Sequence, residues 1–345
     1  MRKTLPALLL LCALLLCACG TQSEEPYSLT LWYVEDDPLA PVFLRLAEDY
    51  NRERERDSLA VTTRAWTNEE LLLRALESGA SPGLVLCSHE LAFHLYEQER
   101  LYDPKLAVID CPAWLRERSD CVGHGFFPIG SELPLLCVRN GFPTTLGALL
   151  AEGSGEWESA QPLLAVERFA PLFYQVLLDA GTEFTATARR DELSLDYVNF
   201  YNALAGLAFE HVLSAAPEAA APCRIASSPT LRDRELNGCG VYPLSDGPLL
   251  ATCRGLALTA RDTRMQRALP DFLRWLAGSA RLGQAALEAG LIPAGEESLR
   301  ADSPLEATLL SLRERSQHLP DAGCSYYVNQ SFFEEEFRAA LELLH

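Results

Sequence analysis

The sequence has little positive charge for its length. Its 345 residues include 29 Lys and Arg against 48 Asp and Glu, which gives a formal net charge of -19. Lys3 and Lys105 are its two lysines. A chain this acidic repels nucleic-acid phosphates and anionic lipid headgroups. We therefore expect no nucleic-acid partner and no electrostatic binding to an anionic membrane surface.

Motifs typical of enzymes and metal proteins are also absent. The sequence contains no Gly-x-Ser-x-Gly elbow, Walker loop, glycine-rich dinucleotide fingerprint or Cys-x-x-Cys pair. His89 and His94 flank a short stretch that resembles a zinc-protease motif, but residues five apart do not share one helix face. The sequence thus predicts no catalytic residue, metal ligand or cofactor. The paired carboxylates of a glycoside hydrolase are set in space, so this enzyme stays open as an alternative.

Long apolar runs are missing beyond the N-terminus, where residues 5–18 follow Arg2 and Lys3. Such a run is too short for a transmembrane helix, which needs about 20 residues, and is typical of a signal peptide over residues 1–18. The tetrad 16–19 (Leu-Cys-Ala-Cys) resembles the lipobox of bacterial lipoproteins. That resemblance implies acylation of Cys19, with residues 19–26 as a lipidated tether. We therefore expect a lipid anchor in the cell membrane, on its extracytoplasmic face.

Eight cysteines remain in the predicted mature chain after Cys19. An exported location permits disulfides, and eight cysteines allow 105 pairings. Under that compartment argument, we favour Cys111 with Cys121. Cys87 and Cys137 end apolar runs, where a buried free thiol is equally natural. The pairing therefore stays open.

Three strand and helix units open the predicted folded part. Each combines an apolar, β-rich stretch with a following segment in which apolar residues recur at helical spacing. A capping box at residues 67–70 is expected to begin the second helix. The strands cover residues 28–34, 59–66 and 83–87, and the helices cover residues 41–54, 70–77 and 90–97. Strands this apolar predict a mostly parallel sheet with helices on both faces.

The composition changes near Gly123, where we place the first crossing to a second lobe. Residues 145–236 are rich in helix patterns, and a capping box at residues 303–306 begins another helix. Further strands are expected at residues 135–138, 240–244 and 255–259, and further helices at residues 169–178, 262–277, 280–289 and from 332 to the end. The predicted organisation is lobe 1 over 27–140, lobe 2 over 141–240, and a return to lobe 1 with C-terminal helices over 241–345.

The order of several short segments resembles the extracellular solute-binding proteins that feed ABC importers, in the branch that binds sugars and oligosaccharides. The resemblance rests on residues 29–33, 77–85, 126–129, 135–140, 143–145, 255–258, 268–276 and 290–294. It implies an α/β, two-lobed periplasmic-binding-protein-like fold with a hinge of crossing strands and a helical C-terminal region. It also implies a monomer that delivers a small ligand, most simply a sugar, to ABC transporter permease subunits. A ligand-binding protein for a membrane sensor kinase is the alternative.

Candidate ligand-binding residues follow from the rule that open α/β sheets bind ligands beyond the carboxyl ends of their strands. Aromatic faces and carboxylates together suit sugar rings and hydroxyl pairs. Trp32 is equally suited to packing, and the acidic turn at residues 35–37 also suits an amino sugar or a polyamine. The predicted set is Trp32, Tyr33, Glu35, Asp36, Asp37, Trp66, His89, Glu90, Phe127, Glu132, Tyr174, Tyr242 and Asp246.

Overall fold

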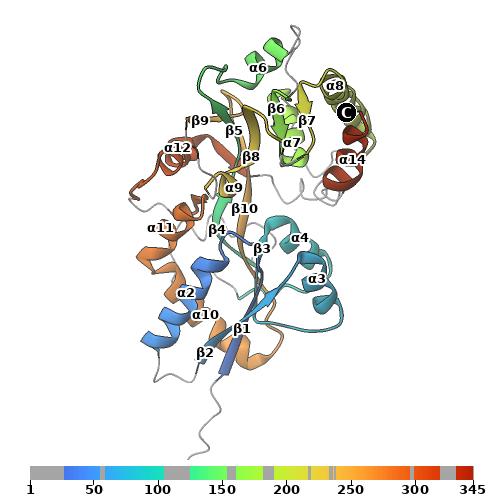
Figure 1. The fold of residues 1–345 in the computed structure, drawn as a ribbon. Helices are drawn as coiled ribbons and strands as arrows, with labels where there is room; N and C mark the ends of the chain where they lie inside the picture. The colour runs from blue at the N-terminus through green and yellow to red at the C-terminus, as the bar shows by residue number, and fades with distance from the viewer. Residues whose placement is uncertain are drawn as a thin grey trace, which may run out of the picture.

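The computed structural model forms two lobes, each with its own β-sheet (Figure 1). It describes residues 27–54, 59–104, 125–153, 161–181, 190–216, 219–232, 236, 238–295, 299–318 and 332–344. Among these residues, one sheet has seven strands and the other has five. The predicted two-lobed α/β architecture is confirmed. Within the described residues, no helix is both long and apolar enough to span a bilayer.

The first lobe begins with the three predicted strand and helix units. Their strands are parallel, with β1 in the middle. Helix α3 begins one residue earlier than expected, because the side chain of Asn68 caps it by accepting from the N–H of Leu71 (2.9 Å). The units are β1 (Tyr27–Val34), α2 (Ala40–Glu53), β2 (Leu59–Trp66), α3 (Glu69–Glu77), β3 (Leu84–Ser88) and α4 (His89–Glu97).

The prediction of a mostly parallel sheet is wrong beyond these units. The strand order is β11-β4-β10-β3-β1-β2, and β10 is antiparallel to both β3 and β4. The physical reason is the chain path: β4 leaves the first lobe and β10 returns to it from the second. The added strands are β4 (Phe126–Glu132), β10 (Leu249–Leu258), β11 (Ile292–Pro293) and β12 (Ser316–His318), which pairs with the start of β10.

Helices cover both faces of this first sheet, as predicted (Figure 1). One face packs against α2, α10 (Thr263–Ala277) and α11 (Ala280–Glu288), with Phe43, Tyr50 and Phe272 in the contact. The other face packs against α3 and α4 through Leu72, Leu91 and their neighbours. The predicted cap at Ser303 is present, since its hydroxyl accepts from the N–H of Glu306 (3.2 Å). The later helices are α10 (Thr263–Ala277), α11 (Ala280–Glu288) and α12 (Pro304–Leu312).

The second lobe is built on a sheet with the strand order β7-β6-β8-β5-β9. Phe169, Phe173 and Phe200 lie in its core together with Phe337 from the C-terminal segment. The strands are β5 (Pro134–Arg139), β6 (Leu164–Val166), β7 (Leu213–Ser214), β8 (Cys223–Ser227) and β9 (Cys239–Pro243). The helices are α6 (Leu146–Gly153), α7 (Phe169–Asp179), α8 (Arg190–Phe209), α9 (Ser228–Arg232), the π-helix η4 (Phe332–Phe337) and α14 (Arg338–Glu342).

Side chains of the second lobe hold two of the segments that join the lobes. Leu133 connects β4 to β5, and its backbone exchanges hydrogen bonds with Ser228: its N–H donates to the hydroxyl and its carbonyl accepts from the N–H. Buried Gln175 on α7 accepts from the N–H of Leu250 (2.9 Å) and donates to the carbonyl of Pro248 (3.0 Å). The crossings are therefore positioned by α7 and α9.

Candidate functional site

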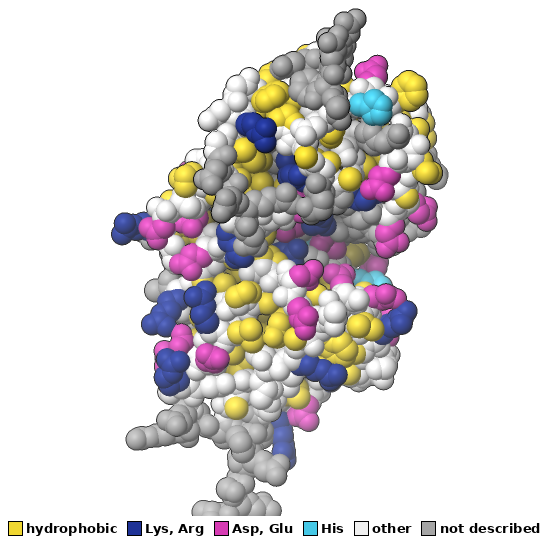
Figure 2. All heavy atoms as spheres, viewed as in Figure 1, with side chains coloured by type: hydrophobic (Ala, Val, Ile, Leu, Met, Phe, Trp, Pro, Cys, Tyr) yellow, Lys and Arg dark blue, Asp and Glu magenta, His cyan; other side chains and the backbone are white. Residues whose placement is uncertain are grey.

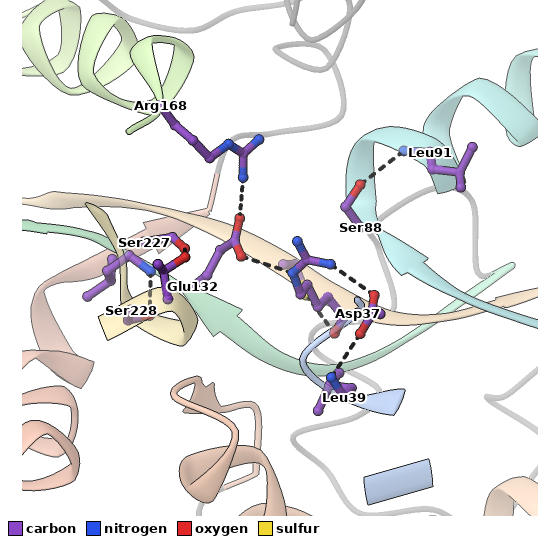
Figure 3. Close-up of polar contacts among 12 residues, drawn as sticks. Asp37, Leu39, Ser88, Leu91, Glu132, Arg168, Ser227 and Ser228 are labelled. Carbon is purple, nitrogen blue, oxygen red and sulfur yellow. Dashed lines mark hydrogen bonds and ion pairs between the residues drawn. The ribbon is translucent and has the colours of Figure 1, made fainter. Parts of the chain in front are cut away.

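Four charged side chains form a continuous chain of ion pairs where the lobes meet. Glu132, the last residue of β4, is 5% exposed. One of its oxygens accepts from Arg168 Nη1 (2.9 Å) and the other from Arg254 Nε (2.9 Å). Arg168 directly precedes α7 in the second lobe, so the carboxylate links the two lobes (Figure 3).

The chain of ion pairs continues into the first lobe. Arg254 Nη1 donates to Asp37 Oδ2 (2.9 Å), and Asp37 Oδ1 accepts from the backbone N–H of Leu39 (2.9 Å). Asp37 lies in the turn after β1 and is buried. We call Asp37, Arg254, Glu132 and Arg168 the interlobe ion network.

The two carboxyl groups of the network differ in their electrostatics. Burial raises the pKa of Glu132, but the guanidinium groups of Arg254 and Arg168 outweigh it, so this pKa is lowered from its usual 4.5. Burial also raises the pKa of Asp37, and Arg254 offsets only part of that rise. The difference follows from the number of cations, because Glu132 contacts two guanidinium groups and Asp37 contacts one.

Arg254 owes its position to a β-bulge in β10. The register between β10 and β4 shifts between Arg254 and Gly255. A Cβ atom at Gly255 would lie 2.1 Å from the carbonyl oxygen of Phe127, so a residue with a side chain would displace the backbone of β4. Bulges redirect side chains beside functional sites. Here the bulge lies next to the arginine that joins both carboxylates.

Two further carboxylates from the first lobe lie within electrostatic range of Arg254. Glu69 and Glu90 stand in the first turns of α3 and α4, directly beyond β2 and β3. Both interact with Arg254, and they repel each other. The segments that directly follow β1, β2 and β3 therefore each supply an acidic side chain near the half-buried guanidinium of Arg254.

A tryptophan pair lies on one face of β1 and β2. The ring centroids of Trp32 and Trp66 are 4.8 Å apart, and the guanidinium carbon of Arg64 lies 4.3 Å from the Trp66 centroid and 5.2 Å from that of Trp32. The N–H of Glu35 donates to the Trp66 carbonyl (2.9 Å), which ties the turn that carries Asp37 to the end of β2. Trp66 Nε1 is buried and has no hydrogen-bond partner within the described part of the chain.

The second lobe contributes polar groups beside Arg168. Glu167 Oε1 accepts from the hydroxyl of Thr230 (2.8 Å), which also contacts the Ser227 hydroxyl (2.9 Å). The buried Oε2 of Glu167 has no partner among the described residues. A cavity of ≈ 10 Å³ separates Ser227 from Glu132 and Arg168, which is room for one water molecule. Figure 2 shows the surface hollowed between the lobes, with acidic and basic side chains gathered there.

The structure brings some predicted ligand residues together and separates others. Asp37, Glu132 and Glu90 meet around Arg254, and Trp32 meets Trp66. Glu35 and Asp36 are exposed in the same turn as Asp37. Asp246 is exposed in the second crossing, and Tyr242 is half-buried beside the second core.

Other predicted residues lie inside the protein. Phe127 and Tyr174 belong to the two hydrophobic cores, which leaves neither ring face open to a ligand in this conformation. His89 is buried with its ring 5.7 Å from that of Phe126. Tyr33 packs against the core on the sheet face opposite Trp32, because neighbouring strand residues alternate. Cys19, Cys111 and Cys121 lie outside the described residues.

Arg254, Arg168 and Glu69 were missed by sequence reasoning. One signal was present for Arg254, since it is the single charged residue in a ten-residue apolar strand. A charge in a buried strand requires a partner of opposite sign. Glu69 was read only as part of a helix cap, and Arg168 carried no comparable signal.

Comparisons with solved structures identify the fold. A cyclic α-maltosyl-1,6-maltose binding protein from Arthrobacter globiformis matches with a TM-score of 0.65 and 15% identity, over 93% of this chain and 95% of that one. The GacH receptor of Streptomyces glaucescens, solved unliganded and with acarbose, has a TM-score of 0.68 and 13% identity over 93% of each chain. Maltose-bound MalE3 of T. maritima has a TM-score of 0.67 and 13% identity, over 92% and 95% of the chains.

The chain therefore has the two-lobed periplasmic-binding-protein-like fold. These neighbours are substrate-binding proteins rather than enzymes. A scan against protein-family models found no match. A search of curated proteins also found none.

Proposed function

We propose that this protein binds a carbohydrate between its lobes and delivers it to an ABC importer. The observation that carries the proposal is the interlobe ion network, which places two buried carboxylates and two guanidinium groups at the junction of the lobes. The solved neighbours with the same fold bind maltose, acarbose or a cyclic maltosyl-maltose.

The chemistry of the site suits a sugar. Carboxylate and guanidinium groups held in a fixed arrangement form charge-assisted hydrogen bonds with neighbouring hydroxyl groups. Glu69, Glu90 and Glu167 add acceptors around the network from both lobes. The half-buried Trp66 ring would supply an apolar surface for the C–H face of a sugar ring, supported by Trp32 in the core behind it, and Trp66 Nε1 would supply an unused donor.

The proposed setting follows from the N-terminus. A lipid on Cys19 would hold the protein at the extracytoplasmic face of the cell membrane, and the polar residues 20–26 would form its tether. A lobed binder on so short a tether stays near the permease it is proposed to supply. We infer that it acts there as a monomer.

A thermal-shift panel tests the binding proposal. Purified mature protein is heated with mono- and oligosaccharides, with polyamines and amino acids as a second set. A ligand present at 100 times its Kd stabilises the native state by about 2.7 kcal/mol, so a saccharide is expected to raise the Tm measurably. No shift with any saccharide would contradict the proposal. A shift with polyamines alone would indicate that the acidic groups bind a polyamine instead of a sugar.

A further inference from the structure

Two cysteine thiols of the second lobe contact each other across neighbouring strands. Cys137 lies on β5 and Cys239 on β9, and the two thiols are near enough to influence each other electrostatically. Both side chains belong to the same hydrophobic cluster, in which Cys137 is buried and Cys239 is half-buried. The contact therefore joins a buried thiol to one that solvent can reach.

The strand register explains the contact. Cys137 is directly opposite Val241, and Arg139 is directly opposite Cys239, so the two cysteines are diagonal neighbours on one sheet face. Diagonal Cα atoms in a regular ladder are about 7–8 Å apart, slightly beyond the usual disulfide range. β9 is the edge strand of its sheet, so it can shift toward β5 without disturbing another strand on its far side.

We propose that Cys137 and Cys239 are a disulfide-forming pair. The bond would tie the strand that follows the first crossing to the strand that precedes the second, and so would close a loop containing most of the second lobe. The extracytoplasmic setting proposed above is oxidising enough for such a bond to persist. The pair is independent of Cys111 and Cys121.

The chemistry is thiol–disulfide exchange with an external disulfide, either a small molecule or an oxidoreductase. The thiolate of Cys239 attacks one sulfur of the oxidant and releases the first external thiol. Cys137 then loses its proton and displaces the second, forming the Cys137–Cys239 bond. Two protein thiols are oxidised, one external disulfide is reduced to two thiols, and the protons pass to the released sulfurs.

The environment of each thiol sets this order. Burial, followed by the neighbouring Cys239, raises the pKa of Cys137 to about 12, so Cys137 is a poor first nucleophile. Cys239 is half-buried and accessible to an external disulfide. We therefore assign attack to Cys239 and resolution to Cys137.

The first lobe offers a matched pair for comparison. Cys87 is opposite Gly255, which makes Cys253 its diagonal neighbour in the same hydrophobic cluster. Here the thiols contact the backbone: Cys87 accepts from the N–H of Ala257, and Cys253 donates to the carbonyl of Arg254 (3.8 Å). Both are buried, so an external disulfide has no accessible thiol to attack.

The experiment uses the folded mature protein. It is fully reduced, freed of reductant, incubated with oxidised glutathione, and then denatured in an alkylating reagent for peptide mapping. We expect one cross-linked peptide pair that contains Cys137 and Cys239, with Cys87 and Cys253 alkylated singly. Alkylation of both Cys137 and Cys239 as free thiols would overturn the proposal, whatever the result of the saccharide panel.

Two variants test the order of reaction. In Cys137→Ala, glutathione is expected to remain on Cys239 as a mixed disulfide, because the resolving thiol is gone. In Cys239→Ala, Cys137 is expected to stay unmodified. Glutathione on Cys137 in that second variant would overturn the assigned roles, and Cys253→Ala serves as the control that still forms the Cys137–Cys239 bond.

Discussion

At the residue scale, the interlobe ion network depends on how the charge of a single arginine is neutralised. Arg254 stands in a strand that carries no other charge, and burial alone would lower its pKa. The carboxylates of Glu132 and Asp37 more than offset burial, so the pKa is raised and the guanidinium stays charged. Removing one carboxylate leaves the Arg254 guanidinium with too little opposite charge. Breaking an ion network by removing one partner is strongly destabilising.

The two carboxylates are expected to respond differently to neutral isosteres. Glu132→Gln should reduce the free energy of unfolding by about 3 kcal/mol, because it leaves two guanidinium groups without their shared anion. Asp37→Asn should cost about 1 kcal/mol, since the amide oxygen can still accept from Leu39 and burial already disfavours the charged carboxylate. Urea unfolding at neutral pH measures both. Equal losses would contradict the assignment of Glu132 as the central anion.

The same network predicts a pH dependence. The pKa of Glu132 is lowered in the folded state, so its stabilising contribution is complete above the unfolded value of 4.5 and is lost as the pH falls through the folded value. The Tm difference between wild type and Glu132→Gln should therefore be constant near neutral pH and shrink below about pH 4.5. A difference that does not change across the acid range would show that Glu132 carries no paired charge.

Sequence reasoning located half of this network. Asp37 was predicted as a ligand group because it follows a strand and Glu132 because it lies at a crossing between the lobes, whereas their partners Arg254 and Arg168 were not predicted. Pairing of this kind joins residues far apart in the chain, Asp37 with Arg254 for example, and depends on which strands become neighbours. Local periodicity carries no information on that choice.

At the element scale, β10 determines the geometry of the site. Most strands and helices were predictable from alternation, helical spacing and caps, and β2 has the predicted bounds. The antiparallel insertion of β10 was not predictable, because its apolar sequence is compatible with either direction. The bulge at Gly255 is likewise a property of its pairing with β4.

The bulge leads to a prediction for Gly255→Ala. The added methyl group would lie 2.1 Å from the Phe127 carbonyl oxygen, so we expect a loss of about 1–3 kcal/mol in the free energy of unfolding. Gly206→Ala is the matched control, because its Cβ meets nothing within 4 Å at an exposed position of helix α8. That control should be neutral or stabilising by about 0.5–1 kcal/mol. Similar unfolding curves for the two variants would argue against the close approach of β4 and β10.

At the scale of the whole molecule, two features are joined: a predicted lipid anchor and a two-lobed body. The C-terminal segment packs into the second core through Phe337 and Leu341. The chain therefore returns to the second lobe after the last helices of the first lobe. Sequence reasoning placed the return to the first lobe near residue 241; β9, which begins at Cys239, is still a strand of the second sheet, and β10 carries the chain back into the first. It left open where the last helices would pack, because an apolar helix face does not specify its partner.

Cys19 is expected to determine where the protein resides. In a bacterial host that processes lipoproteins, the wild-type chain should fractionate with membranes, while Cys19→Ser should lose the acylation site and accumulate in soluble form or as unprocessed precursor. Immunoblots of the fractions measure this, and metabolic labelling with a fatty-acid analogue checks acylation. Cys17→Ser is the neighbouring control. A wild-type chain that carries no label, or a Cys19→Ser chain that is still labelled, would contradict the anchor.

Saccharide binding is best measured by calorimetric titration with the saccharide that gives the largest thermal shift. We compare wild type with Trp66→Ala and with Trp275→Ala, a control whose half-buried indole packs against the first core and donates to Glu53 (2.8 Å). We predict one saccharide per chain, at least tenfold weaker binding in Trp66→Ala, equal to about 1.4 kcal/mol, and unchanged binding in Trp275→Ala. Equal affinity in all three proteins would contradict a sugar site that includes Trp66 at the end of β2 in the first lobe.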